Sequence, residues 1–205
     1  TYLRGDESWA AITAASLAYD PGQTNDVTRT VQNRLRDFYT FKDFGAVGDG
    51  VTNDTTAINN AIDFIRQGIA SPSTVKAFKY VLDGAGGVYR CDGSINVTGI
   101  DARQAWGIKN FIVNSHATGK IALDLGASRY GHFENVYVWG DETDRPKIGI
   151  AQYRDSGGTP ADSHRFAGVS VDGYFSQAAL FNYASEECIY EHCFFYIRKD
   201  AAGAG

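Results

Sequence analysis

Two carboxylates and two aromatic rings are the side chains of this sequence best suited to chemistry: Asp141, Asp172, Trp139 and Tyr196. An aromatic ring stacks on the C–H face of a pyranose, and a carboxylate accepts hydroxyl hydrogen bonds or transfers a proton. Glycoside hydrolysis usually needs two carboxyl groups, about 5–5.5 Å apart for retention and about 6.5–9.5 Å apart for inversion. Whether these side chains can meet depends on a repeat in the chain.

The repeat consists of four segments that align with one another. They are GIKNFIVNS (107–115), HFENVYVWG (132–140), HRFAGVSVDG (164–173) and CIYEHCFFYI (188–197). A second strand candidate follows three of them, at 121–125, 147–151 and 178–182. A period of about 25 residues with two or three short strands is typical of a β-solenoid, in which each coil must stack on its neighbours.

Strand alternation then predicts an outward column. If the valines of these segments face the core, Asn114, Trp139, Asp172 and Tyr196 face outward, with neighbours about 4.8 Å apart. Asp141 follows Trp139 closely and Asp172 lies one coil further on, so the two carboxylates are candidate catalytic residues and the two rings are candidate sugar contacts. The adjacent outward column, with Ile112, Tyr137 and Phe194, is apolar and equally fits a face covered by another subunit or a loop.

Other chemistry stays open. A second acidic group is formed by Glu186, Glu187 and Glu191. A lyase would instead need a base and a cation, for which the candidates are Arg129, His132, His164 and Arg165. The histidines fall in different coils without a close carboxylate or cysteine pattern, so we expect no metal site and no cofactor.

Turns and insertions are predicted from the same alignment. Asn110, Asn135, Gly168 and His192 share one position, and Asn and Gly tolerate left-handed φ, so this position is expected to turn the chain between two strands. The extra residues of one repeat, 153–163, are polar and contain Gly and Pro. They predict a protruding loop.

The segment FKDFGAVGDGVTNDTTAINNAID (41–63) combines a short strand, a glycine-rich turn and an amphipathic helix that Asn53 or Asp54 can cap. The amino-acid sequence of this segment resembles the start of the β-helix in the pectate-lyase-like superfamily, above all in bacteriophage tailspikes. The resemblance is strong over residues 28–140, and the remainder follows by the repeat alone.

This resemblance implies an all-β fold, a right-handed parallel β-helix with an N-terminal capping α-helix and a short helical neck. It also implies a homotrimer, mounted on a virion through tail or baseplate proteins that precede residue 1. Such spikes act at the bacterial cell surface, where they recognise a capsule or O-antigen polysaccharide. Many cleave it by glycoside hydrolysis or β-elimination, without one shared catalytic motif.

Three regions are expected along the chain. Residues 1–23 read as a linker, and residues 24–40 as a helical neck with the stripe Val27, Val31 and Leu35. Residues 41–205 read as the N-terminal part of the β-helix domain. The lack of methionine and the strand-like sequence before AAGAG indicate a fragment of a longer protein. The resemblance implies catalytic residues on central or later coils or between subunits, so an active site past residue 205 stays open.

Composition excludes several partners. The net charge of −5 and the isoelectric point of about 5.3 argue against a nucleic-acid partner, which needs a basic face. No apolar run approaches the ~18–20 residues of a membrane span. Cys91, Cys188 and Cys193 form no disulfide framework and are expected to be free thiols.

Two other functions remain alongside depolymerisation. One is a non-catalytic adhesin or structural segment of a spike, and the other is a cellular pectin-type enzyme. The predicted neck favours the first of these over the second. A groove with paired carboxylates would distinguish a depolymerase from an adhesin.

Overall fold

The computed structural model describes residues 2–3, 9–10, 13, 15–19, 29–31, 39–70, 80–183, 185 and 187–198. The chain divides into two compact units, Thr1–Tyr39 and Thr40–Gly205. The first contains two short antiparallel pairs, β1 (Tyr2–Leu3) with β2 (Trp9–Ala10) and β3 (Ala18–Tyr19) with β4 (Arg29–Thr30). Most of the predicted linker and neck, including Val27 and Leu35, lies outside the described residues. Residues 29–30 are strand where the neck helix was expected.

The second unit begins with the segment that carries the family resemblance. It forms the 3-10 helix η1 (Phe41–Phe44), strand β6 (Asp49–Asn53) and helix α2 (Thr55–Ala70). The side chain of Asn53 accepts a hydrogen bond from the amide of Thr55 (3.1 Å) at the start of the helix. The buried carboxylate of Asp54 instead accepts the amides of Val47 (2.8 Å) and Gly48 (3.0 Å), so it ties the glycine-rich turn to the helix.

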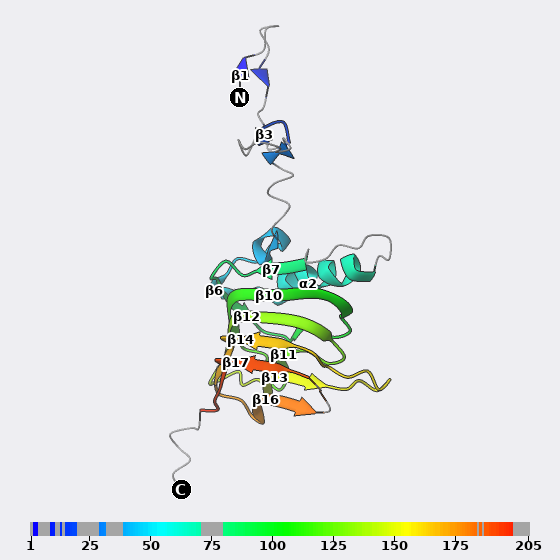
Figure 1. Ribbon diagram of the computed structural model, residues 1–205. Coiled ribbons are helices and arrows are strands. Elements are labelled where there is room, and N and C mark those ends of the chain that lie inside the picture. The colour runs from blue at the N-terminus through cyan, green and yellow to red at the C-terminus, as the bar shows by residue number, and fades with distance from the viewer. Residues whose placement is uncertain are drawn as a thin grey trace. The chain divides into compact units, whose positions relative to one another are not determined.

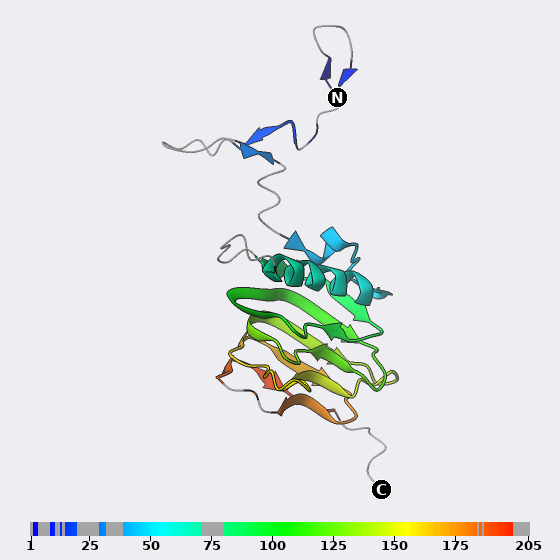
Figure 2. The same ribbon diagram turned by 90° about the vertical axis from the view of Figure 1, so that its right-hand side faces the viewer.

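Helix α2 buries the apolar stripe that its sequence predicts. Ile58, Ala61, Ile62 and Ile65 are all buried. The helix contacts η1 and two strands, β7 (Tyr80–Asp83) and β9 (Ile95–Asn96). It therefore lies beside the first coil of the sheet structure (Figures 1 and 2).

The rest of the unit is a parallel β-solenoid (Figure 1). Its coils contain, in order, β7, β8 (Val88–Cys91) and β9; β10 (Asp101–Ser115) and β11 (Ile121–Asp124); β12 (Arg129–Gly140) and β13 (Ile148–Tyr153); β14 (Arg165–Ala167), β15 (Ser170–Gly173) and β16 (Ala178–Tyr183); and β17 (Ile189–Glu191) with β18 (Phe194–Phe195). One sheet has the order β17-β14-β12-β10-β7-β5, with β5 at Tyr39–Thr40 and with β6, β8, β15 and β18 attached. The other has the order β16-β13-β11-β9.

The strand register confirms the predicted repeat. Ile108 pairs with Phe133, Phe133 with Phe166, and Phe166 with Tyr190. Further along the same strands, Val113 pairs with Val138 and Val138 with Val171, and all three valines are fully buried. The second strand also aligns, because Ile121 pairs with Ile148 and Ile148 with Ala178.

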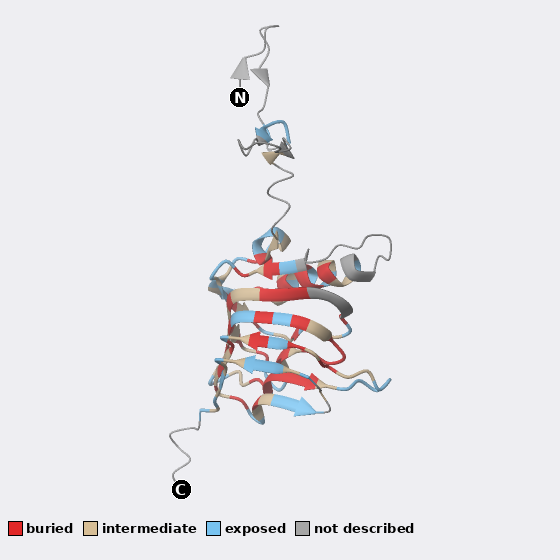
Figure 3. Ribbon diagram, in the orientation of Figure 1, coloured by how far each residue is buried: buried red, intermediate tan, exposed pale blue. Residues whose placement is uncertain are grey.

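Aromatic rings stack along the axis of the core. The ring of Phe166 is stacked on that of Phe133 at 5.1 Å and on that of Tyr190 at 5.0 Å, with interplanar angles of 11° and 5°. Such contacts form because equivalent side chains of successive coils lie one strand spacing apart. Figure 3 shows the buried positions alternating with exposed ones along the strands.

The shared turn position is confirmed. Asn110, Asn135, Gly168 and His192 all have positive φ, at 56°, 52°, 62° and 53°. The amide of the Asn135 side chain donates to Oδ1 of Asn110 (3.2 Å), so the turn residues also bond from coil to coil. The strands therefore bend at the same point in these four coils.

The insertion predicted at 153–163 is a loop between β13 and β14, seen in yellow in Figure 1. Its tip is exposed, whereas Ala161 and Asp162 are buried where the chain returns to the solenoid. Asp162 forms an ion pair with Arg129 (2.7 Å) that anchors this return. No helix in the described parts of the chain is long and apolar enough to cross a membrane.

Candidate functional site

The predicted outward column exists in the structure. Asn114 pairs with Trp139, and Trp139 pairs with Asp172. The amide of Tyr196 donates to the carbonyl of Val171 (2.8 Å), which continues the same register into the next coil. Val138 and Val171 are buried between these positions, so strand alternation turns the column toward solvent.

Asp172 does not stand alone in this column. Both of its carboxylate oxygens accept from the guanidinium of Arg198, at 3.0 and 2.8 Å, and one also accepts from the Tyr137 hydroxyl at 3.3 Å. The hydrogen bonds from Arg198 are the main reason that the pKa of Asp172 lies below its ordinary value. Asp172 is therefore held as a carboxylate and is poorly suited to donate a proton.

Arg198 is the residue of this site that the sequence reasoning missed. Its guanidinium lies 4.5 Å from the centroid of the Trp139 ring, in cation–π geometry, while it holds Asp172. It therefore covers part of the ring that was expected to receive a sugar. A signal was available, because Arg198 lies two residues after Tyr196 and strand alternation gives both the same outward direction.

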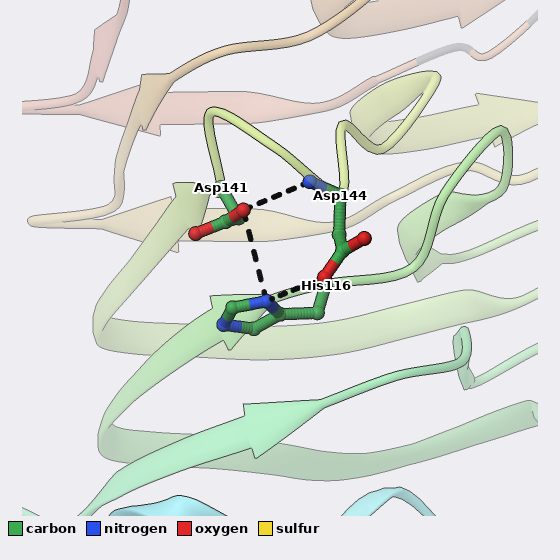
Figure 4. A group of neighbouring side chains, drawn as sticks. All are labelled: His116, Asp141 and Asp144. Atoms are coloured by element: carbon green, nitrogen blue, oxygen red, sulfur yellow. Dashed lines mark hydrogen bonds and ion pairs between the residues drawn. The ribbon is translucent and has the colours of Figure 1, made fainter.

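Asp141 belongs to a different group of side chains (Figure 4). Its Oδ1 accepts the amides of Thr143 and Asp144, both at 2.8 Å, and lies 3.7 Å from Nδ1 of His116. Partial burial would raise the pKa of Asp141, but these two amides, with His116 and Arg90, outweigh it and lower the pKa. Asp141 thus faces His116 and Asp144, whereas its predicted partner Asp172 faces Tyr137 and Arg198.

The second acidic group is dispersed. Glu186 lies outside the described residues. Glu187 is exposed and its carboxylate lies at hydrogen-bond distance from the Ser163 hydroxyl (3.5 Å). Glu191 is paired with Arg165 at 2.6 Å. These contacts join neighbouring coils and fit a structural role on the surface.

The fold divides the candidate lyase residues between the core and the surface. His164 is 1 % exposed, and its Nδ1 accepts the amide of Gly131 (3.0 Å). Burial lowers the pKa of His164 to about 4, so it is neutral at physiological pH. His132 and Arg165, in contrast, lie side by side on β12 and β14 and line an open cavity of about 220 Å³.

Exposed apolar side chains collect on the last described strands. They are Phe181, Tyr183, Ile189, Tyr190, Phe194 and Tyr196. Figure 3 shows β16 and β17 largely in the exposed colour. The rings of Phe194 and Tyr196 are stacked on each other at 6.0 Å, with an interplanar angle of 26°. Tyr196 is therefore the most accessible ring of the predicted outward column, and its stacking partner Phe194 belongs to the adjacent column.

Comparisons with known proteins identify only the architecture. No protein-family model and no curated protein sequence matches the chain. Among solved structures, the surface adhesin PfbA of Streptococcus pneumoniae matches with a TM-score of 0.54 at 14% identity, over 80% of this chain and 39% of that one. The mannuronan C-5 epimerase AlgE6 A-module of Azotobacter vinelandii matches with a TM-score of 0.47 at 17% identity, over 76% and 44%.

A phage protein is also among these matches. Tailspike protein 3 of bacteriophage CBA120 has a TM-score of 0.44 at 13% identity, over 92% of this chain and 39% of that one. The chain thus spans about two fifths of the length of these structures. At such identities the likeness concerns the fold, and the fold that this chain shares with the pneumococcal adhesin is the parallel β-solenoid.

Proposed function

We propose that this chain is part of a phage tailspike that recognises a bacterial surface polysaccharide along the outer face of its solenoid. The observation that carries the proposal is the outward group of Trp139, Asp172, Tyr196 and Arg198, which combines aromatic rings with hydrogen-bonding charged groups. Sugars are bound by such combinations. The resemblance of residues 41–63 to the start of tailspike β-helices adds the phage context.

Each residue has a distinct role in this proposal. Tyr196, 52% exposed and stacked on Phe194, offers an open ring face to a pyranose. Trp139 offers a second ring when Arg198 moves aside. Asp172 and Arg198 then exchange part of their mutual pairing for hydrogen bonds with sugar hydroxyls.

Depolymerisation is the further step of the proposal, by glycoside hydrolysis with Asp141 and Asp172 as candidate catalytic residues. Because both have lowered pKa values, they would serve as a base, a nucleophile or a stabilising charge. The proton donor would then be a different group. The alternative is a non-catalytic receptor-binding segment, and the pairing of Asp172 with Arg198 favours it for the described coils.

The proposed assembly is a homotrimer on the virion tail, attached through tail or baseplate proteins and acting at the bacterial surface, with α2 as the cap of the solenoid. The outward apolar residues Ile112, Tyr137 and Phe194 support it, since such a face is often covered in an oligomer. Light scattering of the parent protein at micromolar concentration tests it. A monomeric mass would contradict the proposed trimer but would leave the proposal of polysaccharide recognition unaffected.

The test of recognition uses the chain and its parent protein with a panel of capsular and O-antigen polysaccharides. Binding is measured by calorimetry, and cleavage by new reducing ends and by the ultraviolet absorbance of an unsaturated product. Trp139→Ala and Tyr196→Ala should each weaken binding about tenfold or more, as expected for the loss of one stacking contact. Tyr183→Ala is the matched control, because Tyr183 is 64% exposed but lies on β16 of the other sheet.

The outcomes separate the alternatives. Reducing ends without the absorbance indicate a hydrolase, and reducing ends with it indicate a lyase. Binding without cleavage in both proteins favours the adhesin. If the folded Trp139 and Tyr196 variants bind as well as the Tyr183 variant, the outward column is not the sugar site.

A further inference from the structure

Three ligand-type side chains meet at the corner where two long strands end (Figure 4). His116 follows β10, while Asp141 and Asp144 follow β12. The Nδ1 atom of His116 lies 3.3 Å from Oδ2 of Asp144 and 3.7 Å from Oδ1 of Asp141. One nitrogen and two oxygen atoms bound to the same metal at roughly 2.1 Å lie about 3–3.5 Å from one another. The group is therefore close to the spacing of a metal-ligand set.

The backbone brings these residues together. Ser115 pairs with Gly140, and the amide of Asp141 donates to the carbonyl of Ser115 (3.0 Å), so His116 and Asp141 hold equivalent positions of adjacent coils. The same Oδ1 of Asp141 accepts the amides of Thr143 and Asp144, which folds the loop back toward the imidazole. The ligand geometry is thus formed by the repeat and by a hydrogen-bonded turn before any ion enters.

The group is also open and negatively charged. The side chains of His116, Asp141 and Asp144 are 15%, 25% and 48% exposed, so an ion can enter and water can complete its coordination. The neighbouring Arg90 is itself paired with Asp92 at 2.8 Å, so it offsets only part of the charge of the two carboxylates. A protonated His116 would offset only part of that charge.

We propose that His116, Asp141 and Asp144 bind a divalent transition-metal ion, with zinc as the best fit, and that the ion fastens two successive coils of the solenoid. An imidazole with two carboxylates suits zinc or manganese, whereas calcium and magnesium prefer oxygen ligands alone. The site revises the sequence expectation of no metal ligands. It shares Asp141 with the catalytic pair of the proposed function, but zinc binding is measured without polysaccharide, so either proposal can fail while the other stands.

The test titrates the whole chain, freed of metal with a chelator, with zinc, manganese and calcium chlorides in turn. Calorimetry should show one zinc ion per chain. At free zinc of about 100 times the Kd, the melting temperature should rise by roughly 5 °C or more. Zinc should also shift the ring ¹⁵N signals of His116 in NMR spectra.

Two substitutions and a control decide the assignment. His116→Ala and Asp144→Asn should each weaken zinc binding about tenfold or more, and Asp144→Asn alters an exposed side chain, so it is expected to fold. His132→Ala is the matched control, since His132 is exposed on β12 outside the group. The proposal is overturned if zinc does not bind, if binding persists without His116, or if the His132 variant loses it equally.

Discussion

At the level of single residues, the ion pair of Asp172 and Arg198 sets what the outward column can do. The carboxylate receives two hydrogen bonds from the guanidinium, which in turn lies over the ring of Trp139. Charge, hydrogen bonding and ring contact are therefore linked in one group. A change of Arg198 therefore alters the protonation of the carboxylate and the access to the ring together.

We expect Arg198→Gln to raise the pKa of Asp172, because the substitution removes the largest cause of its lowering. The Tyr137 hydroxyl would still donate to the carboxylate, so the pKa should return only partly toward its ordinary value. NMR titration of the carboxyl carbon measures the change. Arg145→Gln, whose guanidinium faces the carbonyl of Glu142 and the ring of Tyr174, is the control and should leave Asp172 unchanged.

His164 should make stability depend on pH. Its pKa is about 4 in the folded chain against an ordinary value of 6.5, so below pH 6.5 the unfolded state binds a proton that the folded state does not. The stability that depends on a neutral His164 is fully present above pH 6.5. It is lost as the pH falls from 6.5 toward 4, because the unfolded state is then stabilised by binding the proton. Between pH 7 and pH 5 this loss amounts to about 2 kcal/mol.

Urea unfolding of the wild type and of His164→Gln at both pH values measures this loss. Carboxylates titrate in both proteins, so the difference between the two pH dependences isolates the histidine. The variant should lose about 2 kcal/mol less than the wild type over this interval. Equal losses would show that His164 does not control the acid sensitivity of the fold.

At the level of elements, adjacent coils approach too closely for side chains at some glycines. A Cβ atom on Gly149, in β13, would lie 2.4 Å from Cγ1 of Val171 and 2.5 Å from the carbonyl oxygen of Ala179. The backbone contact cannot be relieved by a rotamer change. The second sheet must therefore shift if this position gains a methyl group.

Gly149→Ala should lower the free energy of unfolding by about 3 kcal/mol, near the upper end for overpacking a core. Gly157→Ala is the control, because its Cβ would lie 3.3 Å from the exposed side chain of Asp155 in the loop. Chemical unfolding measured by circular dichroism gives both values. A Gly149 variant as stable as the Gly157 variant would mean that the coils can separate locally at little cost.

The sequence predicted the elements well because their signals are periodic. The alignment of Ile108, Phe133 and Phe166 depends only on the spacing of apolar residues, and the structure has this register. The shared turn position followed from the tolerance of Asn and Gly for positive φ. The sequence left Asn53 and Asp54 as alternative caps, and it does not reveal that the carboxylate of Asp54 accepts the turn amides instead of those of the helix.

The candidate site was predicted less completely because its contacts depend on side-chain direction beyond the strands. Trp139 and Asp172 were placed together by the repeat, but Arg198 follows the last strand and had no aligned partner. His116 and Asp141 each follow the last paired residues of their strands, Ser115 and Gly140. Their contact could be predicted only by continuing the strand register one residue beyond that pair. Asp144 came into reach only through the turn that Asp141 organises.

At the level of the whole molecule, the solenoid leaves strand edges and apolar side chains accessible on its last described coil. Ile189 and Phe194 are 54% and 55% exposed there, beside the half-exposed ring of Tyr190. Exposed parallel strands with apolar side chains recruit other chains. We therefore expect the isolated polypeptide of residues 1–205 to self-associate through this coil.

Ile189→Lys should reduce this association, because a charged residue on an edge strand opposes pairing with another chain. Multi-angle light scattering over a range of concentrations measures the average mass. Val51→Lys is the control, since Val51 is 72% exposed but lies on β6 rather than on the last coil. Similar masses for both variants would place the self-association elsewhere.

The loop at 153–163 has a consequence for how such a molecule can diversify. It lengthens one repeat without disturbing the pairing of Phe133 with Phe166 or of Ile148 with Ala178 on either side. The Arg129–Asp162 ion pair holds the loop where it returns to the solenoid. The number of residues in the loop therefore does not affect the packing of the core. New recognition surface could be gained here by insertion, in evolution or by engineering, while the pitch of the scaffold stays constant.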